Sequence, residues 1–118
     1  MSSFANKSVH ERQAEVLRML KKYPDKVPVV IVKDKGCKNI TEPANTKFLV
    51  PNELTVAQFL YTLRKRIFLK PDQALFLFFG KSNEMPSATD QMVSVYERHR
   101  DPNDDMLYAI YSSESTFG

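Results

Sequence analysis

The chain contains 118 residues, 42% hydrophobic and 26% charged, a composition typical of one folded globular domain. Its net charge of +3 suits an anionic surface or an acidic peptide, but the chain lacks the dense basic and aromatic stripe of nucleic-acid binders. Three glycines and one cysteine exclude a glycine-rich phosphate loop, an intrachain disulfide and a thiolate metal cluster. Because no apolar leader or long apolar run is present, we expect a soluble, cytoplasmic protein.

The first predicted element is an amphipathic helix that begins after Ser8 and ends at about Lys22. Ser8 and Glu11 have the spacing of a capping box, in which each side chain accepts the other residue's backbone N–H. Apolar residues then recur on one helical face among charged ones. Pro24 ends the helix, since the residue before a proline is pushed out of the α region.

Two strands are predicted after this helix. Residues 27–32 are mostly β-branched and bounded by charged residues, which is typical of a strand. Pro28 cannot donate a hydrogen bond to a neighbouring strand, so it favours either the start of the strand or a sheet edge. After a polar loop, residues 33–46, residues 47–51 predict a second short strand that pairs with the first as a hairpin.

A second helix has the clearest local signal in the chain. Thr55 and Gln58 form a capping box, while Leu54 and Phe59 occupy the positions of a hydrophobic staple. Apolar residues follow at helical spacing: Val56, Leu60, Leu63 and Ile67.

The second half of the chain predicts two further strands with a short helix between them. Residues 74–79 form an apolar run too short and too aromatic for an independent helix, so we expect a buried strand. Residues 86–98 predict a short helix that opens at Pro86, and residues 106–111 predict the last strand. Residues 112–118 form a polar tail that we expect to be flexible.

The order of elements predicts an α+β protein with the ubiquitin-like β-grasp fold. In that fold the first strand pair and the two later strands form a four-stranded mixed sheet, and one helix covers it. Residues 1–24 would be an N-terminal helical extension of a single domain covering residues 1–118.

No catalytic or metal site is predicted. His10 and His99 lie far apart without a third ligand and indicate surface histidines. Cys37 lies in a polar loop without a neighbouring base and indicates an incidental thiol. The aspartates of residues 101–105 lack the spacing of a calcium loop and predict a solvated turn. We therefore expect neither an enzyme nor a cofactor.

Six segments in consistent order resemble the autophagy ubiquitin-like modifiers, the family that contains the GABA-receptor-associated protein (GABARAP) and the microtubule-associated protein light chains. Together they cover nearly the whole chain after its first residues. The segments are KYPDKVPV (22–29), FLVP (48–51), LTVAQF (54–59), RKRI (64–67), LYAIYS (107–112) and ESTFG (114–118).

This resemblance implies that the chain is conjugated through Gly118. Ubiquitin-like activating and conjugating enzymes would join that glycine as an amide to phosphatidylethanolamine on autophagosomal membranes. A cysteine protease would process the precursor and reverse the conjugation. A glycine at the end of a polar tail suits narrow enzyme channels, because it has no Cβ. The protein would be cytoplasmic, and on autophagosomes when lipidated.

The resemblance also implies a peptide groove along the second strand, whose free edge would accept a linear motif as an extra strand. That motif is an aromatic residue followed three residues later by an aliphatic one. The aromatic pocket would comprise Glu15, Met19, Pro28, Val30, Lys47, Leu49 and Met106. The aliphatic pocket would comprise Phe48, Val50, Pro51, Leu54, Phe59 and Thr62. Basic residues beside the groove would attract acidic residues that flank the motif: Lys26, Lys47 and Arg66.

Strand alternation qualifies this list, since it places Phe48 and Val50 on the opposite face from Lys47 and Leu49. Some of these residues must therefore be plain core, and taken singly Val50, Leu54 and Phe59 are the ones that we expect to be core residues. Three of the groove residues depart from the family pattern: Met19, Thr62 and Met106. The pliable methionines predict an adaptable aromatic pocket, and the threonine predicts a narrower aliphatic one.

A second hypothesis is an adaptor of the same fold that is never conjugated. It would bind receptors through the groove and tubulin through Lys21 and Lys22, as some members of the family contact tubulin through a basic N-terminal helix. No nucleic-acid partner is expected.

Overall fold

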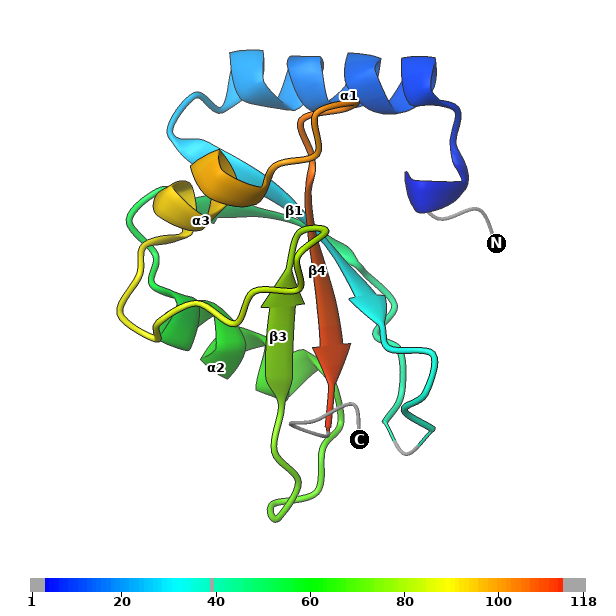
Figure 1. Ribbon diagram of the computed structural model, residues 1–118, viewed down its shortest axis with the longest axis vertical. Helices are drawn as coiled ribbons and strands as arrows, with labels where there is room; N and C mark the ends of the chain where they lie inside the picture. Colours follow the sequence, from blue (N-terminus) through cyan, green and yellow to red (C-terminus); the bar gives the residue numbers. More distant parts are fainter. Residues whose placement is uncertain (1–3, 39, 114–118) are drawn as a thin grey trace.

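The computed structural model describes residues 4–38 and 40–113, which form four helical segments and four strands (Figure 1). None of the described helices is both long and apolar enough to cross a membrane. In chain order the elements are η1 (Phe4–Asn6), α1 (Val9–Lys22), β1 (Lys26–Lys33), β2 (Lys47–Pro51), α2 (Val56–Arg66), β3 (Phe76–Phe79), α3 (Met92–His99) and β4 (Leu107–Ser112).

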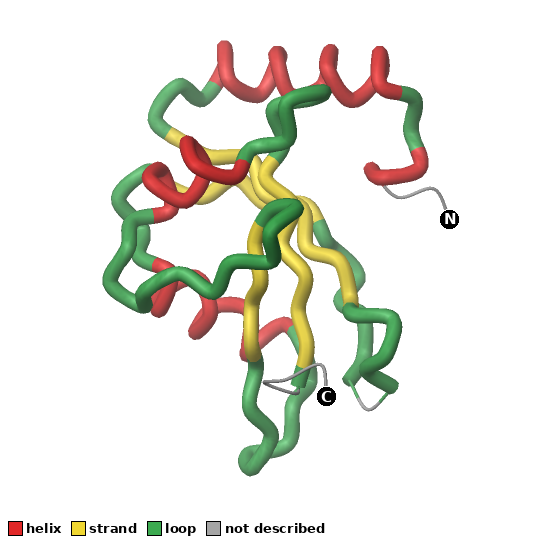
Figure 2. The backbone as a smooth tube through the Cα atoms, in the orientation of Figure 1, coloured by secondary structure: helices red, strands yellow, loops and turns green. Residues whose placement is uncertain are grey.

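The strands form one mixed sheet in the order β2-β1-β4-β3 (Figure 2). The central strands β1 and β4 are parallel, and each pairs with its outer neighbour in the antiparallel sense. The hairpin expected between the first two strands is present, with Val27 opposite Val50. The α+β, ubiquitin-like fold and the four-stranded mixed sheet are confirmed.

The two faces of the sheet carry separate clusters of buried side chains. On one face Phe59 and Leu63 of α2, and Ile67 just after it, pack against alternate residues of the strands, and each is at most 1% exposed. On the other face Val16 of α1 packs with Phe4, with Val30 of β1 and with Met106, which precedes β4. The predicted apolar stripe of the second helix faces the core: Val56, Leu63 and Ile67 are buried, and Leu60 is half-buried and packs against the same cluster. Phe59, assigned to the hydrophobic staple, is buried there as well.

The caps of the first two long helices differ in completeness. At α2, the Thr55 N–H donates to the Gln58 side chain over 2.9 Å and the Gln58 N–H donates to the Thr55 hydroxyl over 3.2 Å. At α1, the Glu11 N–H donates to the Ser8 hydroxyl, but the Glu11 carboxylate accepts that same hydroxyl's proton. The predicted capping box is complete at the second helix and half-formed at the first.

The short helix begins later than predicted, at Met92 instead of residue 86. The preceding stretch caps α2: the Val56 N–H donates to the Asp90 carbonyl and the Ala57 N–H to the Ala88 carbonyl, over 2.9 and 3.0 Å. The first N–H groups of a helix have no partner within it, so these bonds hold the stretch outside helical geometry. The expectation of a helix from residue 86 was wrong because it considered only local sequence.

The proline of β1 lies at the start of an inner strand. Pro28 pairs with Leu49 of β2, whereas the parallel pairing with β4 begins one residue later, at Val29. The missing N–H of Pro28 therefore falls before the region where both neighbours are present. Of the two positions that the sequence allowed, the start of the strand is the one observed.

The last strands differ slightly from their predicted bounds. β3 begins at Phe76, two residues later than expected, and pairs there with Ser112. Ser112, expected to open the flexible tail, is the last residue of β4 and is 1% exposed. Residues 114–118, including the predicted conjugation site Gly118, lie outside the described residues.

Candidate peptide-binding groove

The strand assigned to peptide binding lies at an edge of the sheet. β2 pairs with β1 over five residue pairs, from Lys26 opposite Pro51 to Val30 opposite Lys47, and it is the first strand in the sheet order. An edge strand presents backbone N–H and C=O groups that a further strand can pair with. β2 therefore has the position that strand addition requires.

The side chains of β2 alternate between two faces, as the sequence predicts. Lys47 and Leu49 lie opposite Val30 and Pro28 of β1, on the side of the sheet that α1 covers. Phe48 packs against the core cluster on the α2 side, where its ring meets that of Phe59 edge to face at 5.9 Å. Leu49 and Phe48, residues assigned to the two predicted pockets, thus lie on opposite faces of one edge strand.

On the α1 side, a carboxylate links two lysines. Glu15 of α1 accepts hydrogen bonds from Lys47 of β2 and from Lys7, the latter over 2.6 Å. Partial burial disfavours the charged carboxylate, but these two bonds outweigh it and lower the pKa of Glu15. Glu15 is therefore a charged anchor that holds the Lys47 ammonium against α1.

Phe4 lies beside residues of the predicted aromatic pocket, although no role was predicted for it from the sequence. Its side chain is 5% exposed and shares a buried cluster with Val30 and Met106, two residues of the predicted aromatic pocket. The Lys47 ammonium lies 5.8 Å from the centre of its ring, within cation–π range. Phe4 is the one aromatic residue before the first helix, and that isolated aromatic in a polar stretch was the available signal.

On the α2 side, Arg66 covers the exposed part of Phe48. The guanidinium carbon lies 5.7 Å from the centre of the Phe48 ring. Thr62, one turn earlier on the helix, donates its hydroxyl proton to the Gln58 carbonyl over 3.1 Å. This bond satisfies the polar group that departs from the family pattern, so the helix accommodates threonine without an unpaired hydroxyl proton.

Comparison with known proteins places this arrangement in a family. Residues 11–118 match the family model described as "Autophagy protein Atg8 ubiquitin like". The chain belongs to the Atg8 family. The resemblance drawn from six sequence segments is confirmed.

Relatives at similar identity come from plants and a fungus. The chain is 41% identical over 119 residues to Autophagy-related protein 8d of Arabidopsis thaliana, covering 100% of this chain and 96% of that protein. It is 42% identical over 118 residues to Autophagy-related protein 8 of Mycosarcoma maydis, covering 99% and 97%. It is 43% identical over 111 residues to Autophagy-related protein 8A of Oryza sativa subsp. indica, covering 93% and 89%.

The residues assigned to the groove of this Atg8-family chain differ in exposure. A buried set can form only the floor: Pro28, Val30, Val50, Phe59 and Met106. A half-buried or exposed set can meet a peptide directly: Glu15, Met19, Lys26, Lys47, Phe48, Leu49, Pro51, Leu54, Thr62 and Arg66. Their role in peptide binding stays a prediction, whereas the core role suspected for Val50 and Phe59 agrees with their burial.

The acidic turn of the Atg8 chain contains a buried ion pair, which corrects the expectation of a solvated turn. The Asp104 side chain has 0% exposure and accepts bonds from Arg12 over 2.8 Å and from the Met106 N–H over 2.8 Å. It also accepts the Tyr108 hydroxyl proton over 2.5 Å. Burial, with this bond, raises the pKa of Tyr108. Asp104 therefore ties α1 to β4.

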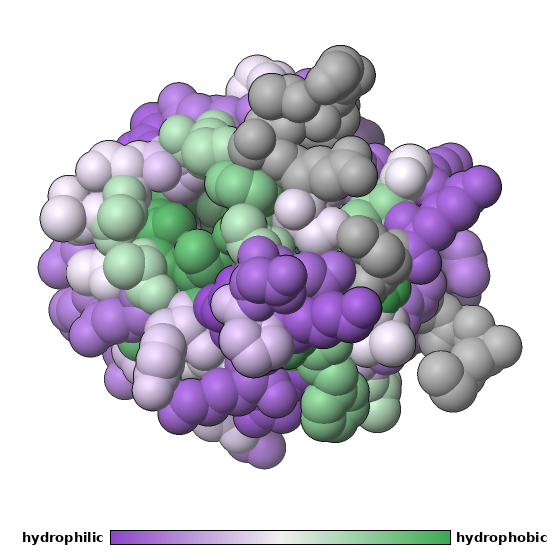
Figure 3. Space-filling model, turned by 90° about the horizontal axis from the view of Figure 1, so that it is seen from below, coloured by the Kyte–Doolittle hydropathy of each residue, from purple (hydrophilic) through white to green (hydrophobic). Residues whose placement is uncertain are grey.

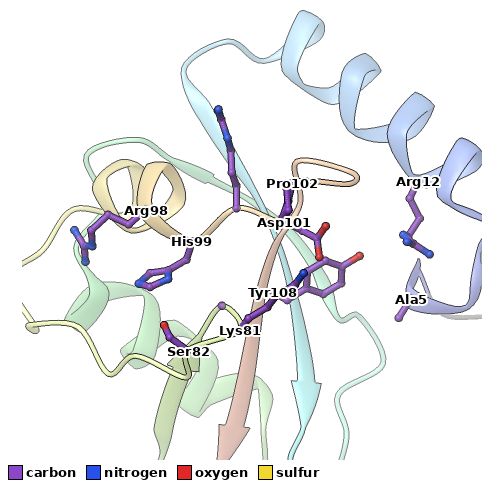
Figure 4. Close-up of a pocket in the computed structure, with 11 residues that line it drawn as sticks. Ala5, Arg12, Lys81, Ser82, Arg98, His99, Asp101, Pro102 and Tyr108 are labelled. Carbon is purple, nitrogen blue, oxygen red and sulfur yellow. The ribbon is translucent and has the colours of Figure 1, made fainter.

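A separate cavity of about 660 Å³ is lined by residues of η1, α1, the turn after β3 and the end of α3 (Figure 4). Lys81 points toward Tyr108 in it. Arg12 is bonded to Asp104, and Arg98 is paired with two carboxylates. His99, expected at the surface, is only 12% exposed and lies 2.8 Å from the Glu84 carboxylate. Because these groups stabilise the fold, we assign the cavity no ligand.

Proposed function

We propose that this chain is a ubiquitin-like modifier that is conjugated through Gly118 to phosphatidylethanolamine and recruits motif-bearing proteins on autophagosomal membranes. Membership of the Atg8 family supports the first part. The chain itself would not be an enzyme: activating and conjugating enzymes, and a cysteine protease, would act on its carboxylate. We infer a cytoplasmic pool that moves to autophagosomes on conjugation.

The observation that supports the recruiting role is that Leu49 and Phe48, residues assigned to the two predicted pockets, lie on opposite faces of an edge strand. Successive side chains of a strand point to opposite faces, so two residues three positions apart also do. A peptide with an aromatic residue and an aliphatic residue at that spacing, added beside β2, would direct one anchor toward Leu49 and the other toward Phe48. The spacing of the motif and the geometry of β2 therefore agree.

The charge around the groove favours acidic residues next to the motif. Lys26 is half-buried at the start of β1, opposite Pro51 at the end of β2, and Arg66 is exposed over Phe48. Lys47 retains 39% exposure of its side chain although it is bonded to Glu15. A peptide carboxylate could therefore meet a cation at either end of the strand.

Isothermal titration with an acidic peptide that contains one aromatic-x-x-aliphatic motif tests the groove. We expect Leu49→Ala and Lys47→Glu each to weaken binding at least tenfold. The matched control is Lys81→Glu, which makes the same charge change at an exposed residue of the other sheet edge. Equal weakening by the control and Lys47→Glu, or unchanged affinity of Leu49→Ala, would contradict the assignment.

Reconstitution with the cognate activating and conjugating enzymes and phosphatidylethanolamine vesicles tests the attachment. We expect a lipid conjugate with the natural sequence and none with Gly118→Ala. Equal conjugate from both proteins would reject Gly118 as the attachment point.

The adaptor hypothesis keeps a specific observation in its favour, since Lys21 and Lys22 are exposed at the end of α1. Co-sedimentation with microtubules would test it. Binding that Lys21→Glu and Lys22→Glu abolish, together with an unreactive Gly118, would favour the adaptor.

A further inference from the structure

The segment that follows α2 exposes an aromatic side chain among basic residues. Phe68 is 84% exposed, the highest value among the exposed large hydrophobic residues, and Tyr61 on α2 is 63% exposed. The Lys65 ammonium lies 4.4 Å from the centre of the Tyr61 ring. Single exposed apolar residues are common and need no explanation. Two exposed aromatic residues seven positions apart, with basic residues between them, form a pattern that requires an explanation.

The positive charge of the whole chain is concentrated at this place. Residues 34–46 and 64–75 together contain six basic and three acidic residues, whereas the rest of the chain contains eleven of each. These two segments therefore account for the entire net charge of +3. We call them the basic end.

The basic end lies at the end of the sheet where β4 ends. Lys33, at the end of β1, is opposite Tyr111, and Phe76, at the start of β3, is opposite Ser112. The Cys37 sulfur lies 3.1 Å from the Ser113 hydroxyl oxygen. The loops that contain residues 34–46 and 67–75 accordingly reach the same end of the molecule as the end of β4 (Figure 1).

We propose that the basic end docks non-covalently on an anionic phospholipid surface. Cations near such a surface are attracted to it, and an exposed aromatic ring can enter the boundary between headgroups and acyl chains. Figure 3, which views the molecule from this side, shows a largely hydrophilic surface with hydrophobic areas between the polar ones. Cations spread over two loops suit a lipid surface, which presents charge over an area and has no shape to match.

Docking through the basic end would turn toward the bilayer the end of the molecule at which β4 ends, and with it the segment that contains Gly118. Gly118 lies five residues after Ser113, and an extended chain of that length spans at most about 18 Å. A lipid joined to Gly118 would therefore hold the body close to the bilayer. The docking itself does not depend on conjugation, but its alignment with a linked lipid rests on the proposed function.

Flotation of the full, unconjugated chain with vesicles tests the docking in the absence of conjugating enzymes. We expect binding to vesicles of phosphatidylcholine with phosphatidylserine, weakened by added salt, and little binding to phosphatidylcholine alone. Lys70→Ala should weaken binding about fivefold, the effect of one cation near the surface. Phe68→Ser should weaken it at unchanged charge. Because both residues are exposed, circular dichroism should show intact folds.

Matched controls lie on α1, away from the basic end. Lys21→Ala removes the same charge as Lys70→Ala, and Leu17→Ser removes an apolar side chain that is 55% exposed. We expect neither to change vesicle binding. Equal losses from Lys21→Ala and Lys70→Ala, or no binding by the unaltered chain at low salt, would overturn the proposal.

The same experiments separate this inference from the proposed function. If Phe68→Ser and the unaltered chain bind vesicles equally while Gly118 is still conjugated, the docking fails and the modifier role stands. If the chain docks but Gly118 is inert, the reverse holds. Retention on an immobilised acidic peptide without vesicle binding would assign the basic end to a protein partner, and would also overturn the proposal.

Discussion

Phe4 and Lys47, 43 positions apart in the chain, meet at the predicted aromatic pocket, with the Lys47 ammonium 5.8 Å from the centre of the Phe4 ring. The same ammonium is bonded to Glu15. The cation that the groove would offer to an acidic peptide is therefore already engaged by the N-terminal part of the chain. A bound peptide therefore either displaces these contacts of Lys47 or packs against Phe4 and Glu15 as part of its binding site.

We predict that Phe4→Ala tightens the binding of an aromatic-x-x-aliphatic peptide several-fold. Val30 and Met106 share the buried cluster of Phe4, so an incoming aromatic anchor would compete with that ring for the same apolar surface. Isothermal titration measures the effect, and Val9→Ala, at a residue of α1 that is 43% exposed, is the control. Weaker binding by Phe4→Ala would instead make the ring a wall of the pocket.

Asp104 should be among the most sensitive positions for stability. We expect Asp104→Ala to lower the free energy of unfolding by about 3–5 kcal/mol, because it leaves Arg12 and the Tyr108 hydroxyl without their shared buried acceptor. Urea denaturation measures the change. Asp72→Ala, at an exposed aspartate, should change it by less than about 0.5 kcal/mol. A loss at Asp104 as small as at Asp72 would refute the role given to the ion pair.

The contrast between Asp104 and β2 shows what sequence could and could not predict. The β2 strand and the α2 cap are set by neighbouring residues, so alternation and cap spacing predicted them correctly. Asp104 is buried because Arg12, distant in sequence, reaches it from another element. Likewise, residues 86–90 are kept from being helical by bonds to α2. Local patterns contain no information about such partners, and Phe4 escaped assignment for the same reason.

The ion pairs of Glu15 with Lys7 and Lys47 predict how the free energy of unfolding changes with pH. The pKa of Glu15 is lowered from 4.5 in the folded chain, so the folded state binds its proton less readily than the unfolded state. The stabilisation is therefore complete above that value and is lost as pH falls through the folded pKa. We expect Glu15→Gln to cost about 2 kcal/mol at neutral pH, with the difference from the natural chain shrinking below about pH 4.5. Urea denaturation across this range measures it, and a constant difference would contradict the ion-pair origin.

Gly80 and His99 should show coupled effects on stability. Gly80 has φ +71°, in the left-handed region, and a Cβ added there would lie 2.7 Å from the His99 Nδ1 atom. We expect Gly80→Ala to lower the free energy of unfolding by about 1–3 kcal/mol from backbone strain, with a further loss from the clash. His99→Ala removes the ring and hence the closest contact, but leaves the His99 Cβ, 3.0 Å from the added Cβ, and the backbone strain.

The double variant separates these two contributions. If the clash is real, Gly80→Ala should cost less in the His99→Ala background than in the natural chain, by at least about 0.5 kcal/mol in a double-mutant cycle. The residual cost then measures the strain at the turn after β3 together with the remaining contact at the Cβ of residue 99. Additive losses would mean that the His99 ring moves aside freely, which would be surprising for a side chain that is 12% exposed and paired with Glu84.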